Sequence, residues 1–381
     1  MNEQHAPPGL EGLVVADTEV GGVRGQEGFF HYRDYSAVEL AEKRRFEHVW
    51  HLFHHGELPT EAQAAAFAHQ LVERRTLPAE LQAALSTVAT LGKGAHPMDA
   101  LRSALSLAAQ TLGTRPWLDQ DAAAVREQAL TLCAWMPALV AGLRRARRGE
   151  PLPPPRDDLS FSAHYLYLLS GQEPSAEHER ALERYWTVTL DHGFNASTFT
   201  SRVVTSTGAD LGGAMVAALG ALSGPLHGGA PGLVIDMLRE IGTPERAAQW
   251  TRDALAHGER IMGFGHRVYR TGDPRAQLLR EVARSLGGPI AELALAVEPT
   301  VLEVLQAHRP SRPLNTNVEF YAGVVLHQLG LASEILSSTF AISRSIGWAA
   351  HVAEQMAHNR LIRPRAAYVG KPPPTQVPDA A

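Results

Sequence analysis

The densest chemistry in the chain is the stretch GFGHRVYRTGDPR, residues 263–275, which sets one histidine and three arginines in a loop interrupted by glycines. Asp273 and Pro274 predict the start of a helix, because the Asp side chain accepts from free backbone N–H groups and proline needs no such partner. Arg275 then falls in the first turn, where the helix dipole already carries partial positive charge. A cation is poorly placed there unless an anion binds it, so we interpret the stretch as an anion-binding loop rather than a solvated basic segment.

Length and composition indicate an ordinary globular protein. The 381 residues exceed the usual size of a single core, which predicts one large and one smaller domain. A net charge of -5 disfavours a general nucleic-acid binder, whose surface would be basic. No apolar run reaches about 18 residues and the N-terminus lacks a signal pattern, so we expect a cytoplasmic protein without membrane contact. The single cysteine, Cys133, lies in an apolar run and is expected to be a buried small hydrophobe.

The order of the elements predicts a mainly helical fold. Residues 13–16 and 29–32 can pair as a minor β-hairpin near the N-terminus, and they hold nearly all the strand signal in the chain. Helical periodicity takes over from Ser36 onward, with short Pro- and Gly-containing joints between helices. Helices are expected to begin near residues 60, 78, 97, 160, 176, 214, 244 and 274, and the last to cover about 331–358. The Pro-rich tail from about residue 371 is expected to be mobile.

The eighteen histidines require that metal sites be considered. His51 and His55 have the i, i+4 spacing of zinc ligands on a helix. The chain has no HExxH motif, and spacing alone supplies no third ligand for this pair. We therefore expect no metal site.

Three other histidines lie in glycine-broken turns rather than on apolar helical faces: His192, His227 and His266. A single histidine in such a turn is usually structural, but three of them favour a shared polar site. Glu319 is flanked by apolar residues that can desolvate a general base, although a solvated acid at a helix start fits its position as well.

Several motifs together give the chain a family resemblance. They are HGFNASTF at 192–199, GPLHGG at 224–229, GFGHRVYR followed by DPR at 263–275, NVEFYAG at 317–323, and the pair Arg363-Pro364. In their order and spacing, and in the Gly-rich segment near the N-terminus, the chain resembles the citrate synthase family in the short form found in many bacteria and archaea. The resemblance covers nearly the whole chain.

The resemblance implies an all-α homodimer with a large and a small domain that close over the site. We expect residues 1–220 and 313–381 in the large domain and 221–312 in the small one. The implied reaction condenses acetyl-CoA with oxaloacetate and hydrolyses the thioester to citrate and CoA, as in the tricarboxylic acid cycle. No cofactor is implied, because the CoA thioester is a substrate.

The resemblance also implies roles for individual residues. His227 would donate to the thioester oxygen, His266 would hydrogen-bond and protonate the oxaloacetate carbonyl, and Glu319 would remove the α-proton. A carboxylate can take this weakly acidic proton only if a placed donor meets the developing enolate oxygen. Oxaloacetate would be held by His192, His266, Arg275, Arg344 and, from the other subunit, Arg363. CoA would be contacted by Arg270, Gly263 and Gly265.

Two positions depart from the family pattern. Glu319 stands where the family has Asp, and its extra methylene moves the carboxylate by about 1.5 Å if the backbone is unchanged. Pro231 stands where the family usually has Asn after HGGA, and it can still open a helix at its first position. Three alternatives follow: an active citrate synthase, a 2-methylcitrate synthase that uses propionyl-CoA, and a non-catalytic paralogue that acts as a binding or regulatory subunit.

Overall fold

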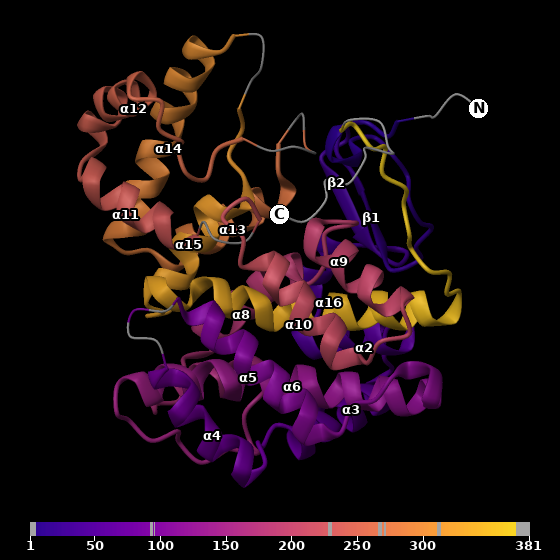
Figure 1. The fold of residues 1–381 in the computed structure, drawn as a ribbon. Helices are drawn as coiled ribbons and strands as arrows, with labels where there is room; N and C mark the ends of the chain where they lie inside the picture. The colour runs from indigo at the N-terminus through magenta and orange to yellow at the C-terminus, as the bar shows by residue number, and fades with distance from the viewer. Residues whose placement is uncertain are drawn as a thin grey trace, which may run out of the picture.

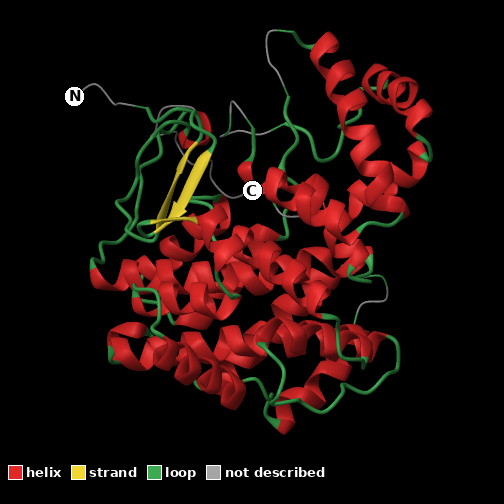
Figure 2. Ribbon diagram, turned by 180° about the vertical axis from the view of Figure 1, so that it is seen from behind, coloured by secondary structure: helices red, strands yellow, loops and turns green. Residues whose placement is uncertain are grey.

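The computed structural model describes residues 5–91, 94, 96–227, 231–265, 269, 272–310 and 314–370. In these parts the chain is mainly helical, and the strands form one small sheet at the end of the molecule near the N-terminus (Figure 2). The all-α architecture predicted from the sequence is confirmed.

The sheet consists of three antiparallel strands, β1 (Gly21–Arg24), β2 (Phe29–Tyr32) and β3 (Tyr35–Ser36). The expected strand at residues 29–32 is present, but its partner is β1 and not residues 13–16, so that part of the hairpin prediction is wrong. An added Cβ at Gly21 would lie 2.5 Å from the carbonyl oxygen of His31. This close approach of the strands leaves no room for a side chain at position 21. Val14 of the apolar run is exposed.

The first half of the chain builds a lower layer of helices and part of the layer above it (Figure 1). Its helices are α1 (Ala37–Lys43), α2 (Phe46–His55), α3 (Glu61–Arg74), α4 (Ala79–Thr90), α5 (Pro97–Leu112), α6 (Ala122–Arg147), α7 (Phe161–Ser170) and α8 (Ala176–Thr189), with short 3-10 turns η1 (Pro8–Leu10) and η2 (Trp117–Asp119). Local caps set several of these starts. The side chain of Thr60 accepts from Gln63 N in a capping box. Ser36 and Ser160 are simple N-caps, whose side chains accept from Glu39 N in α1 and from Ala163 N in α7.

A buried helix, α16 (Leu336–Ala357), runs through the middle of the molecule and packs against α6, α8, α9 (Ala196–Ser206) and α10 (Leu211–Leu222). It begins five residues later than expected, because a separate 3-10 turn, η4 (Ser333–Ile335), precedes it. Trp186 Nε1 donates to the Thr339 carbonyl at 3.0 Å, which ties α8 to α16 within the core.

A further group of helices forms a lobe at the upper left of Figure 1. It contains α11 (Pro231–Ile241), η3 (Pro244–Arg246), α12 (Ala247–Ala256), α13 (Pro274–Leu286), α14 (Pro289–His308) and α15 (Val318–Gln328). Pro231 begins α11, as its position after HGGA predicts. The helix α15 packs against α13, α11 and α14 and also against α8, so it links the lobe to the helices below it. The domain limits stay a prediction.

Two smaller expectations concern the core and the membrane. Cys133 is buried, and burial raises the pKa of its thiol to about 12. This agrees with the expectation of a small hydrophobic residue packed in the core. Among the described residues, no helix combines the length and the apolar character needed to cross a bilayer.

Candidate active site

Six of the predicted site residues line one cavity of about 590 Å³: His192, His227, Gly265, Arg275, Glu319 and Arg344. Each comes from a different segment of the chain. His192 and His227 follow α8 and α10, Arg275 and Glu319 lie in the first turns of α13 and α15, and Arg344 lies within α16. The fold therefore assembles the polar site that the histidine turns indicate.

The loop that contains Gly263 and Gly265 is held beside the start of α15. Gly265 N donates to the Asn315 carbonyl at 2.7 Å, and Asn317 N donates to the Gly263 carbonyl at 2.9 Å. Gly263 has a φ of +82°, and an added Cβ there would lie 2.6 Å from the Cβ of Phe320. Only glycine meets both conditions. Gly265 lines the cavity, whereas Gly263 lies against Phe320.

Glu319 has the environment of a general base. Its backbone N–H donates to the N-cap side chain of Asn317 at 2.9 Å, which fixes the start of the helix. Burial raises the pKa of its carboxyl to about 7, against the opposing effect of the Arg275 and Arg260 charges. A base whose pKa lies near the working pH is partly ionised and still binds a proton firmly.

Ser197 fixes which tautomer the neutral ring of His227 adopts. The Ser197 backbone N–H donates to Nε2 of His227 at 3.2 Å. The Ser197 hydroxyl, which donates to Asn195 Oδ1 at 2.8 Å, lies 2.9 Å from the same ring nitrogen. A backbone N–H can only donate, so Nε2 is an acceptor and the ring proton resides on Nδ1. Burial, assisted by the charge of Arg344, lowers the pKa of His227 to about 4. His227 is therefore a neutral donor at ordinary pH.

Arg275 is buried and paired with Asp273. Its Nε lies 2.9 Å from Oδ1 and its terminal nitrogen 2.8 Å from Oδ2 of that carboxylate. Asp273 also accepts from the backbone N–H groups of Arg275 and Val318, each at 3.0 Å. The N-cap carboxylate of Asp273 therefore supplies part of the charge balance for which the sequence interpretation invoked a bound anion. Binding of an anion by Arg275 stays a prediction.

Arg344 and His192 also line the cavity. Arg344 is buried, its Nε donates to the Thr189 carbonyl at 2.9 Å, and burial lowers the pKa of its guanidinium. Nε2 of His192 lies 2.9 Å from the hydroxyl of Tyr269, a buried residue of the 263–275 stretch. His266 and Arg270 lie outside the described residues.

Arg363 does not line the cavity of its own chain. It is exposed in the segment that follows α16. This segment is held where Ile362 N donates to Ser206 Oγ at 3.0 Å.

Two residues of the site were missed from the sequence. Ser197 lies within the HGFNASTF motif, and Arg260 lines the cavity near Glu319 without belonging to any motif.

The histidines considered for a metal lie apart from this cavity. The rings of His51 and His55 are 4.3 Å apart, and His51 Nδ1 bonds to the Glu57 carbonyl at 2.9 Å. In the part of the chain that the structure describes, no group of three His, Cys, Asp or Glu residues is arranged to hold a metal ion. The expectation that the protein needs no metal stays a prediction.

Comparisons with known proteins agree with the motifs. Residues 9–365 match the family model described as "Citrate synthase, C-terminal domain". Citrate synthase 2 of Bacillus subtilis is 37% identical over 375 residues, 96% of each chain. A 2-methylcitrate synthase of Mycobacterium tuberculosis is 38% identical over 363 residues, 95% of this chain and 90% of the relative. The Thermoplasma acidophilum citrate synthase, solved as a ternary complex with carboxymethyl coenzyme A and oxaloacetate, superposes with a TM-score of 0.88 at 29% identity, covering 98% of each chain.

Proposed function

The chain belongs to the citrate synthase family, whose members are enzymes, and we propose that its cavity condenses acetyl-CoA with oxaloacetate and hydrolyses the thioester to citrate and CoA. The observation that carries this proposal is that Glu319 and His227 line one cavity, with the His227 ring proton on Nδ1. A base and a neutral donor are the two groups that enolisation of a thioester requires.

In the proposed reaction, Glu319 takes a proton from the α-carbon of the acyl group. The donor at His227 Nδ1 stabilises the enolate oxygen as charge develops on it. The resulting carbon nucleophile attacks the oxaloacetate carbonyl, which His266 is proposed to protonate. A neutral His227 suits this role, because its low pKa leaves it a donor without a permanent charge.

Oxaloacetate is a dicarboxylate, and the proposed site offers guanidinium groups to hold it. Planar guanidinium groups bind carboxylates through two parallel hydrogen bonds, which lysine cannot do. Arg275 and Arg344 are both buried on the cavity wall, and His192 lies beside them. We assign these three residues to oxaloacetate, and we assign Arg270, Gly263 and Gly265 to CoA.

The complete site is proposed to need two subunits. Arg363 is exposed and outside its own cavity, which fits the expectation that it serves the other subunit of a homodimer. A cytoplasmic location, a place in the tricarboxylic acid cycle and the absence of any cofactor are proposed on the family resemblance.

The decisive experiment measures oxaloacetate-dependent release of CoA from acetyl-CoA by the purified protein. We expect release that depends on both substrates, with citrate formed in equal amount. Failure to release CoA from any acyl-CoA, while oxaloacetate still binds, would contradict the proposal and favour the non-catalytic paralogue.

The second candidate is condensation of propionyl-CoA to 2-methylcitrate. It is favoured by the Mycobacterium tuberculosis relative named 2-methylcitrate synthase. One methylene in an apolar pocket discriminates by about 10- to 200-fold, so the two acyl-CoAs must be compared directly. A kcat/KM for propionyl-CoA above that for acetyl-CoA would reverse the order of the two candidates.

A further inference from the structure

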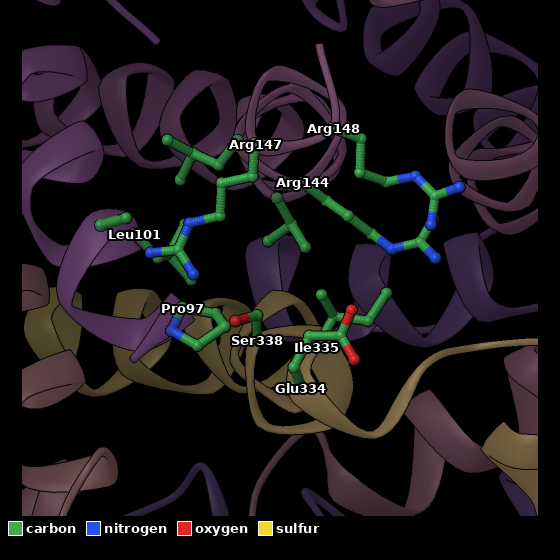
Figure 3. A pocket seen from close by; sticks show the side chains of 11 residues that line it. Pro97, Leu101, Arg144, Arg147, Arg148, Glu334, Ile335 and Ser338 are labelled. Atoms are coloured by element: carbon green, nitrogen blue, oxygen red, sulfur yellow. The ribbon is translucent and has the colours of Figure 1, made fainter. Parts of the chain in front are cut away.

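A second cavity lies at the end of α6, where three arginines gather. Arg144, Arg147 and Arg148 come from the end of α6 and line this cavity. In Figure 3 the head group of Arg147 lies on the side of Pro97 and Leu101, and the head groups of Arg144 and Arg148 lie side by side on the opposite side. The cavity holds about 100 Å³, and its other walls are mostly apolar side chains of α5 and α6, with Ile335 below them. It shares no lining residue with the candidate active site.

Arg144 has unsatisfied hydrogen-bonding capacity at this cavity. Its Nε is buried and has no hydrogen-bond partner among the described residues. No carboxylate of the described chain lies within ion-pair distance of Arg144 or Arg147. Arg148, by contrast, is bonded through Nε to Glu150 at 2.7 Å. Buried donors in native proteins nearly always have a partner, so this arrangement is incomplete without one.

The spacing of the arginines adds mutual repulsion. Arg144 stands four residues before Arg148 and three before Arg147, so the three charges share one face of the helix. Cations are favoured at a helix C-terminus, which accounts for some of them. It does not explain why the head groups of Arg144 and Arg148, which carry like charges, lie side by side (Figure 3). One exposed carboxylate, Glu334, lies on the opposite wall and offsets only part of the charge.

A larger groove opens on the other side of the same arginines. Arg144, Arg148 and Ile335 line both spaces, and the groove holds about 560 Å³. Its wall includes the polar residues Gln172, Ser175 and His178. It also includes the carboxylates of Glu150 and Glu173, which are paired with Arg148 and Arg156. The small cavity has room for a phosphoryl group, and the groove has room for the molecule that carries it.

We propose that Arg144, Arg147 and Arg148 form a binding site for a phosphoryl group carried by a small molecule, separate from the site of catalysis. Guanidinium groups donate paired, charge-assisted hydrogen bonds to phosphate oxygens. Such a ligand satisfies Arg144 Nε and relieves the repulsion along α6. It also contacts η4, which joins α15, the helix of Glu319, to α16, the helix of Arg344.

The test is calorimetric titration of the purified protein with inorganic pyrophosphate. The double variant Arg144→Gln/Arg147→Gln is expected to bind at least about tenfold more weakly, which corresponds to about 1.4 kcal/mol. Glu334→Gln, which removes the opposing carboxylate, is expected to bind more tightly than the unmodified protein. Arg239→Gln is the matched control, because Arg239 is an exposed arginine of α11 paired with Asp236 at 3.5 Å. It is expected to leave the affinity unchanged.

The proposal is overturned if pyrophosphate does not bind the unmodified protein, or if the double variant binds as tightly as the control. Equal losses in the double variant and in Arg239→Gln would show a general charge effect and would also overturn it. A parallel titration with ADP, with saturating CoA present to occupy the candidate active site, tests the groove. ADP should bind more tightly than pyrophosphate and should lose affinity in the same double variant. None of these variants touches the candidate active site, so binding is read independently of turnover.

Discussion

The folded protein shifts the pKa values of Glu319 and His227 in opposite directions. Burial raises the pKa of Glu319 to about 7 and lowers that of His227 to about 4. Over the pH range from about 5 to 8, His227 stays neutral while Glu319 changes from acid to base. The pH dependence of turnover should therefore follow Glu319 alone.

We expect kcat to rise with pH through about 7 and then to level off. Glu319→Gln should lower kcat by about 10²- to 10⁴-fold, the usual contribution of a general base. Glu319→Asp keeps a carboxylate and is the matched control, which should retain a measurable rate and a rising pH profile. A pH profile that is unchanged in Glu319→Gln would remove Glu319 from the role of base.

The same substitution has a predicted effect on stability. Because the pKa of Glu319 is higher in the folded protein than in the unfolded chain, its favourable contribution is present at low pH and is lost as the pH rises through about 7. At pH 8, Glu319→Gln should therefore raise the free energy of unfolding by about 1–3 kcal/mol, as measured by urea denaturation. At pH 4 this increase in the free energy of unfolding should disappear.

At the scale of the elements, one carboxylate organises the starts of two helices. Asp273 is buried, caps α13, accepts from the first N–H of α15 and pairs with Arg275. Two helices that carry site residues are thereby placed relative to each other. This also explains how a cation is tolerated in the first turn of α13.

Asp273→Ala should be far more damaging than loss of an ordinary cap. It removes about 1 kcal/mol of capping and leaves a buried guanidinium without its partner, for a total loss of about 3–5 kcal/mol. Asp121→Ala is the control, since Asp121 is the exposed N-cap of α6 and, among the described residues, its side chain accepts only from Ala123 N. Urea denaturation of both variants measures the difference, and equal losses would contradict the role given to Asp273.

At the scale of the whole molecule, the cavity is assembled from segments that are distant in sequence, from Thr18 near the N-terminus to Arg344 in α16, while Arg363 lies elsewhere. If each Arg363 serves the partner's site, two inactive variants should complement each other. A mixed dimer of Glu319→Gln and Arg363→Gln subunits has one site with both defects and one intact site. Random exchange of equal amounts should then restore about a quarter of the unmodified activity.

The measurement is CoA release after the two variants are unfolded and refolded together. Each variant refolded alone is the control and should stay inactive. Absence of recovery in the mixture, with dimers present by light scattering, would place Arg363 in its own subunit's site or outside catalysis.

The sequence by itself determined the features that depend on neighbouring residues. Thr60 and Asp273 cap their helices through atoms two or three residues away, so their effect is visible in the local pattern. The motifs and their order identified the family and the residues that would line one site. His266 and Arg270 lie outside the described residues, and their roles stay predictions.

Only the tertiary structure decided the properties that depend on residues distant in sequence. The ring proton of His227 is fixed by Ser197, thirty residues earlier. The raised pKa of Glu319 comes from burial by the packed fold. The strand at residues 29–32 pairs with residues 21–24, where the close approach at Gly21 leaves no room for a side chain. Desolvation and close packing are set by the three-dimensional surroundings of a group, so residue type and spacing alone could not supply them.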